Sequence, residues 1–459
     1  MALDPVSSPT SPWYLHTFSA DVTIPLGHPC MGGGIAPARI VADPLEAIGF
    51  VLGGGTLAKA VVFVSVDWCE IRNEAYDAWR ETLAEIAGTD PERVFVTAVH
   101  QHDAPVIDIE AQRLLEARDA AGAVCDIAFA ATAMGNVEDA LRRALGGPGR
   151  RVTHVGIGRA MVDRVASNRR YVLANGTISY HRTSASHDPQ AHVADAGLID
   201  PWLRTLSLWD DDQPLLAVST YAVHPMSYYG QGEVSADFMG MARRARQKSL
   251  PAVVQIYASG CSGNVTAGKY NDGSRSNRPV LAARMEAAMA AAWAQTERHP
   301  LESASFRVVP LWFEPRIGAG HEQSDLEARI ANDAEPFDQC LAAMALSWRH
   351  RTETRRPIDL PVLELGPALI ALLPGETYVE YQLLAQSLRP DAFVLALGYG
   401  ESATGYIPTA VQIAEGDENL DDWYWVSETA EAVLTDGLRL ALAPRTLEAN
   451  AQLDGPPSR

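Results

Sequence analysis

The chain has 459 residues, of which 47% are hydrophobic and 20% charged, a composition typical of a globular protein with a sizeable core. Its 37 Lys and Arg residues against 57 Asp and Glu residues give a formal net charge of −20, which argues against nucleic acid or an anionic membrane surface as the main partner. No apolar run in the sequence approaches the ~20 residues of a membrane-spanning helix, and no secretory signal is recognisable. Five widely spaced cysteines without a CxxC pair favour a reducing compartment. We therefore expect a cytoplasmic protein without a membrane anchor.

Short apolar runs, typical of buried strands, alternate along the chain with longer segments of helical periodicity. Residues 60–66 are predicted to form a strand, residues 70–86 a helix that ends at Gly88, and residues 93–99 the next strand. A strand–helix–strand unit of this kind normally pairs its strands in parallel. The same patterns predict helices over 125–145 and 278–295, and strands over 215–222, 252–258, 368–373 and 392–397.

The domain organisation expected from this pattern is simple. Residues 18–447 should form a single α/β domain with a mixed β-sheet flanked by helices. The polar, proline-containing segments 1–17 and 448–459 should be flexible tails.

Polar side chains directly follow several predicted strands. Residues 100–103 (HQHD) follow one strand, and His224 and Glu376 each follow another. Ligands in α/β proteins bind beyond the carboxyl ends of the strands, so we expect these loops to converge on one edge of the sheet. Strand-to-helix loops are in general polar and rich in glycine. This general tendency accounts for the glycines in these loops, but it accounts less well for two loops with histidine and one with glutamate.

The histidine pattern points to a metal. His100 and His102 are two residues apart, which places both side chains on one side of an extended segment. With His224 and Glu376 they offer the N and O ligands that zinc hydrolases use, and a zinc ion lowers the pKa of bound water to ~7. Structural histidines remain the alternative at this point.

Short motifs recur in a fixed order between about residue 18 and about residue 440. They are residues 20–25 (ADVTIP), 32–34 (GGG), 64–67 (VSVD), 97–102 (TAVHQH), 167–170 (SNRR), 199–201 (IDP), 221–224 (YAVH) with 235–237 (SAD), 263–266 (GNVT), 373–376 (LPGE) and 405–409 (GYIPT). Together they resemble the catalytic N-terminal domain of the neutral (non-lysosomal) ceramidase family. The chain is similar to a short form that lacks that family's C-terminal β-domain.

The resemblance implies a ligand set and an activity. It implies that zinc is held by His100, His224, Glu376 and Tyr406, the tyrosine being suggested by the resemblance alone. The metal would polarise an amide carbonyl and activate the attacking water.

Four further residues are candidate catalytic residues, and the resemblance itself suggests the role of Arg169 alone. His102 would hold the water or move protons, and Arg169 would stabilise the oxyanion. Thr266 stands where the family has serine, and Asp103 brings a carboxylate into a loop that is otherwise small and uncharged in the family. Asp103 could act as a general base, orient His102 or recognise a polar group, or it could simply cap its loop.

The expected substrate is a small or polar amide rather than long-chain ceramide, because the sequence shows no amphipathic anchor. Asn264, Tyr228 and Tyr424 are candidate substrate-binding residues, although such aromatic side chains often pack in cores instead. Two alternatives stay open. The scaffold could hydrolyse an ester, lactone or glycosidic bond, or the chain could be a non-catalytic binding protein. The expected partner is a small-molecule substrate, and a homo-oligomer is compatible with the sequence.

Overall fold

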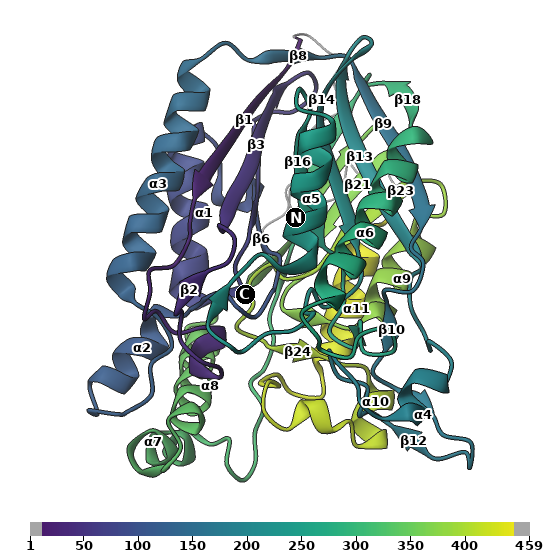
Figure 1. Ribbon diagram of the computed structural model, residues 1–459. Helices are drawn as coiled ribbons and strands as arrows, with labels where there is room; N and C mark the ends of the chain where they lie inside the picture. Colours follow the sequence, from purple (N-terminus) through teal and green to yellow (C-terminus); the bar gives the residue numbers. More distant parts are fainter. Residues whose placement is uncertain (1–11, 445–459) are drawn as a thin grey trace, which may run out of the picture.

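The computed structural model describes residues 12–444 and contains mixed β-sheets and helices, as expected for an α/β fold (Figure 1). Its core contains three main sheets, not the one mixed sheet that we predicted. The first has the order β6-β4-β3-β1-β8, the second β16-β14-β13-β9-β18 and the third β19-β20-β21-β23. The strands of the first are β1 (Trp13–Asp21), β3 (Glu46–Gly54), β4 (Val61–Val66), β6 (Val94–Ala98) and β8 (Arg150–Val152). Those of the second are β9 (His154–Met161), β13 (Trp202–Asp210), β14 (Gln213–Tyr221), β16 (Val254–Ser259) and β18 (Glu297–Pro300). Those of the third are β19 (Ala304–Leu311), β20 (Ile358–Leu365), β21 (Ala368–Leu372) and β23 (Phe393–Leu397).

The three sheets share one pattern of pairing. Each is antiparallel except for a single parallel pair at one edge, which is β4 with β6, β14 with β16, and β21 with β23. The predicted parallel unit of strands 60–66 and 93–99 is thereby confirmed, and the helix between them ends at Gly88 with φ 65°.

The core follows from the alternation of side chains along the strands. Residues on one face of all three sheets form a common core, which includes Phe50, Phe63, Leu206, Ile370 and Leu395. Helices cover the opposite faces (Figure 1). The first sheet packs against α1 (Asn73–Ala87) and α3 (Ile127–Gly146), the second against α5 (Asp237–Ser249) and α6 (Asn277–Ala294), and the third against α9 (Val379–Leu388) and α11 (Ala430–Ala441). A further group comprises α2 (Ile109–Glu116), α7 (Gln323–Asn332) and α8 (Pro336–Glu353).

Two expected boundaries are wrong. The first strand begins at Trp13, inside the predicted tail 1–17, because Trp13 and Leu15 are buried in the common core. The helix expected from residue 70 begins at Asn73, because Glu70 and Ile71 form β5 (Glu70–Ile71), which pairs with β7 (Val106–Ile107). The predicted tail 448–459 lies outside the described residues.

The carboxyl ends of the edge strands β6, β16 and β23 meet in one place. The Ser259 hydroxyl donates to the carbonyl of Val99 at 2.7 Å, and the amide of Gly398 donates to the carbonyl of Ser259 at 3.0 Å. The amide of Ala98 donates to the carbonyl of Tyr399 at 3.0 Å. The predicted loops therefore converge, but they come from three sheets.

Within residues 12–444, no helix combines the length and the apolar character that a membrane crossing requires.

Candidate metal centre

Three predicted ligands meet at the junction of the sheets. His100 follows β6, His224 follows β14, and Glu376 begins β22 (Glu376–Thr377) just beyond β21. All three are buried, and their ligand atoms lie within 4.8 Å of one another. Glu376 Oε2 is 3.1 Å from His100 Nε2 and 3.0 Å from His224 Nε2. The structure thus brings together residues that are up to 276 positions apart, from 100 to 376.

The outer nitrogen of each imidazole is held by a backbone carbonyl. His100 Nδ1 lies 3.0 Å from the carbonyl oxygen of Cys69, and His224 Nδ1 lies 2.6 Å from that of Ser262. A carbonyl oxygen only accepts, so each Nδ1 carries a hydrogen, and Nε2 is the atom that offers a lone pair when the imidazole is neutral. Carbonyl partners of this kind orient metal-binding histidines.

The donor set fits a divalent cation. Two imidazole Nε2 atoms and one carboxylate oxygen converge on a common space, and a cation bound there in place of protons would use the lone pairs of both nitrogens. Ligands 2.0–2.1 Å from a tetrahedral ion lie about 3.3 Å apart, close to the separations given above. A second group, Cys69, His100 and His102, also has its ligand atoms within 4.8 Å, but His100 Nδ1 is already bonded to a carbonyl there.

The buried charges of the site influence one another. Burial opposes ionisation of Glu376, but the neighbouring His100 and His224 outweigh this effect and hold the Glu376 pKa well below its ordinary value. Burial likewise opposes protonation of His100, but the Glu376 carboxylate outweighs it, so the His100 pKa lies well above its ordinary value. Burial and the Arg169 charge lower the His224 pKa to about 4. A carboxylate is therefore present in the site at neutral pH.

Tyr406 and Arg169 lie beside this cluster. Tyr406 begins β24 (Tyr406–Ile407), which pairs in parallel with β22 so that Tyr406 is the direct partner of Glu376. Arg169 follows β10 (Ser167–Asn168), and its Nη1 donates to the Tyr406 hydroxyl at 2.8 Å. Its Nη2 lies 3.4 Å from His224 Nε2. Burial opposes the charge of Arg169, but Tyr406 and other neighbours raise its pKa above the ordinary value, so it stays charged.

His102 lies next to the cluster and is partly exposed. Its ring centroid is 5.2 Å from that of His100, 6.2 Å from that of His224 and 5.1 Å from that of Tyr229. His102 Nδ1 has no hydrogen-bond partner among the described residues. Desolvation, followed by His100 and His224, lowers its pKa well below the ordinary value, so this imidazole is neutral.

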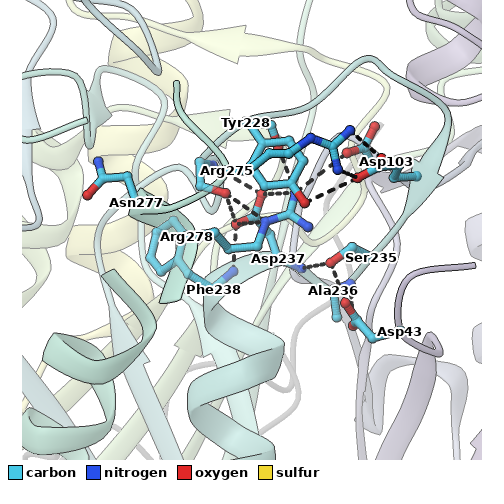
Figure 2. Close-up of polar contacts among 12 residues, drawn as sticks. Asp43, Asp103, Tyr228, Ser235, Ala236, Asp237, Phe238, Arg275, Asn277 and Arg278 are labelled. Carbon is cyan, nitrogen blue, oxygen red and sulfur yellow. Dashed lines mark hydrogen bonds and ion pairs between the residues drawn. The ribbon is translucent and has the colours of Figure 1, made fainter. Parts of the chain in front are cut away.

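Asp103 belongs to an ionic network that includes Arg278 and Asp237 (Figure 2). Its Oδ1 accepts from the amide of Gly230 at 2.9 Å, and its Oδ2 lies 3.7 Å from Nη2 of Arg278. Arg278 also donates to the Ser227 hydroxyl at 2.8 Å and lies 3.4 Å from Asp237. These contacts give Asp103 a structural place that resembles loop capping, and they give no support to the proton-transfer role that we predicted.

Thr266 and Asn264 make structural contacts as well. Thr266 lies in β17 (Val265–Thr266), which pairs with β10, and its hydroxyl donates to the carbonyl of Thr183 at 2.9 Å. Asn264 accepts from the amide of Val379 and donates to Glu380, both at 2.9 Å. The Thr266 hydroxyl is thus engaged by the backbone.

The two tyrosines predicted to bind substrate make other contacts. The Tyr228 ring lies against the Arg278 guanidinium at 3.8 Å, and its hydroxyl donates to Glu233 at 3.2 Å. Tyr424 is buried, and its backbone pairs with that of Gly405, next to Tyr406. Tyr424 thus supports the strand that carries a candidate ligand.

The sequence did not identify two residues that hold the site. Tyr399 stacks on His100, and Ser262 provides the carbonyl that binds His224. The Gly-Tyr-Gly run at residues 398–400 marked a loop, but no residue pattern indicates that its tyrosine packs on an imidazole 299 positions earlier in the chain.

Comparison with solved structures gives the same fold. One neighbour is a ceramidase in complex with C2, with a TM-score of 0.68, 14% identity, and coverage of 94% of this chain and 75% of that chain. Another is the neutral ceramidase from Pseudomonas aeruginosa, with a TM-score of 0.68, 15% identity, and coverage of 94% and 74%. The fold is that of the neutral ceramidases. No family model and no curated protein matches the sequence. The two solved structures confirm the predicted resemblance to a ceramidase-like catalytic domain at the level of the fold.

Proposed function

We propose that this protein is a zinc-dependent hydrolase that cleaves an amide bond of a small or polar substrate. The observation that carries the proposal is the convergence of His100 Nε2, His224 Nε2 and Glu376 Oε2 in a buried space, with both imidazoles oriented by backbone carbonyls. Two histidines, one carboxylate and an open position form an arrangement common in zinc hydrolases. The ceramidase-like fold supports hydrolysis of an amide.

His100, His224 and Glu376 would hold the metal, with the Tyr406 hydroxyl beside them as a fourth ligand. The bound cation would supply Lewis acidity and a nucleophilic water at neutral pH. Among the protein side chains, Arg169 would stabilise the transition state. It donates a hydrogen bond to the Tyr406 hydroxyl at 2.8 Å and remains charged. Its guanidinium can donate hydrogen bonds to the oxygen that becomes negative as a carbonyl is attacked.

His102 is the group best placed to handle the proton. Its imidazole is neutral and lies beside both candidate metal-binding histidines, and its Nδ1 has no hydrogen-bond partner within residues 12–444. A neutral imidazole can accept a proton from the water and pass it to the leaving nitrogen. We therefore assign proton transfer to His102 rather than to Asp103.

A polar hollow supports the substrate class. It has a volume of about 480 Å³, and Tyr229, which contacts the His102 ring, forms part of its wall. The wall also contains Ser184, Gln231 and Arg275, so it can hydrogen-bond a polar substrate better than it can bury an acyl chain.

The proposal is tested by assaying the zinc-loaded protein against matched panels of small polar amides, esters, glycosides and long-chain ceramide. We expect turnover of polar amides, its loss on chelation and its return on adding zinc. His224→Ala should weaken zinc binding at least ~100-fold, because it removes a direct ligand. The control is His154→Ala in β9, where the histidine contacts the Thr153 hydroxyl instead.

Three results would count against the proposal. If His224→Ala contains as much zinc as the parent protein, the proposed metal centre is wrong. Turnover of esters or glycosides alone would reassign the bond that is cleaved. Efficient cleavage of long-chain ceramide would overturn the substrate class.

A further inference from the structure

One tyrosine contacts all three segments that carry the candidate ligands. The amide of Tyr399 donates to the carbonyl of Gly375 at 3.0 Å, directly before Glu376. The carbonyl of Tyr399 accepts from the amide of Ala98 at 3.0 Å, two residues before His100. The backbone of Tyr399 therefore joins the end of β6 to the loop after β21.

The side chain of Tyr399 reaches the two imidazoles. Its ring stacks on that of His100, with centroids 4.3 Å apart and an angle of 19° between the planes. Its hydroxyl lies 2.6 Å from the hydroxyl of Ser262. The carbonyl of the same Ser262 receives the Nδ1 hydrogen of His224 at 2.6 Å. The packing of one imidazole and the hydrogen bond of the other are thus connected through a single phenol.

The backbone of Tyr399 is held in an unusual conformation. Its φ is +58°, in the left-handed region, and that of His100 is +74°. Non-glycine residues adopt this strained conformation only where surrounding contacts fix them. Tyr399 is fully buried, and its backbone hydrogen bonds to Ala98 and Gly375 attach it to the segments that carry His100 and Glu376.

We propose that Tyr399 is a positioning residue that sets the geometry of the metal centre by stacking on His100 and fixing the Ser262 carbonyl that orients His224. This inference rests on the proposed function, since it requires that the three ligands bind zinc. It predicts that the Tyr399 hydroxyl controls metal binding without touching the metal.

The test measures zinc affinity by competition with a chromophoric chelator, and the visible spectrum of the cobalt-substituted protein. We expect Tyr399→Phe to weaken zinc binding about 10-fold, the lower range for partners of metal ligands. Ser262→Ala should weaken it to a similar degree. The double variant should be little worse than either single variant, because both changes remove the same hydrogen bond. The cobalt spectrum should change in each of them, since it reports ligand geometry.

The matched control is Tyr76→Phe. Tyr76 is also buried, and its hydroxyl donates to the carbonyl of Val96 at 3.3 Å, so the variant loses a comparable hydrogen bond away from the ligands. It should keep the zinc affinity and the cobalt spectrum of the parent. Should Tyr399→Phe fail to fold, Ser262→Ala and its cobalt spectrum decide the question.

The outcomes separate this inference from the proposed function. If the parent protein binds zinc tightly, and Tyr399→Phe and Ser262→Ala bind it equally well, the positioning role is wrong while the metal centre stands. Strictly additive losses in the double variant, or the same loss in Tyr76→Phe, would also overturn it. Absence of zinc binding by the parent protein would overturn the proposed function, and the inference with it.

Discussion

At the scale of single residues, the buried carboxyl group of Asp103 next to the candidate centre links the stability of the protein to pH. Asp103 is 3% exposed, and burial, opposed by the Gly230 amide and by Arg278, raises its pKa to about 7. In the unfolded chain an aspartate titrates near ~3.9. Because the folded pKa is the higher one, the folded protein binds this proton more tightly. The stabilising contribution is complete below the unfolded pKa and is lost as the pH rises through the folded pKa.

Asp103→Asn should therefore flatten the pH dependence of stability. We expect the parent protein to lose free energy of unfolding between pH ~4 and ~7 relative to the variant, whose neutral amide can still accept from Gly230. Urea denaturation of both metal-free proteins at pH 5 and pH 8 measures this difference. A difference in free energy that is the same at both pH values would show that Asp103 does not titrate in this range.

At the scale of elements, short segments decide which residues enter the candidate metal centre. Spacing placed His100, His224 and Glu376 together because each follows a strand, and that part of the site was predictable from the residues. Tyr406 was suggested by the resemblance alone, because its approach depends on β24 pairing with β22 across 30 positions, from 376 to 406. Two-residue strands carry no periodicity, so neither this pairing nor the contact of Thr266 with backbone carbonyls can be predicted from local sequence.

The loop after β16 approaches the Glu376 segment so closely that it requires glycine. A Cβ at Gly263 would lie 2.2 Å from the carbonyl oxygen of Glu376 and 2.7 Å from Cδ1 of Tyr378. Gly263→Ala should destabilise the protein by about 1–3 kcal/mol, as overpacking does, and weaken zinc binding by displacing Glu376. Urea denaturation and metal competition measure the two effects.

The control for this variant is Gly135→Ala in α3, where a Cβ meets nothing within 4 Å. Alanine in a helix is favoured over glycine by ~0.5–1 kcal/mol, so this variant should be slightly more stable with unchanged metal affinity. Equal behaviour of the two variants would contradict the close approach of Gly263.

The whole molecule differs from its prediction in the number of sheets, and six of the fourteen strands in the three main sheets were anticipated, namely β4, β6, β14, β16, β21 and β23. Local sequence indicates which residues alternate between the two faces of a strand, but some strands, such as β4, are buried on both faces. The sequence of a strand that is buried on both faces lacks polar alternation, so it does not indicate which strand pairs with it. Whether the strands form one sheet or three is therefore decided by long-range packing. Location, oligomeric state and the organisation as a single domain remain predictions.

The shared core makes the stability of the three sheets a common property. Phe63 of β4 stacks with Phe50 at 5.3 Å and lies 6.2 Å from Phe95, all within the core that the three sheets share. Phe63→Ala should cost ~3–5 kcal/mol, the usual range for a buried phenylalanine. Since this core joins the sheets, we expect far-ultraviolet and near-ultraviolet circular dichroism to report one coincident unfolding transition in the parent and the variant. Phe129→Ala, at a partly exposed position of α3, should cost less. Two separated transitions, with the variant shifting only one of them, would show that the sheets unfold independently, and the metal centre at their junction would then depend on docking between preformed units.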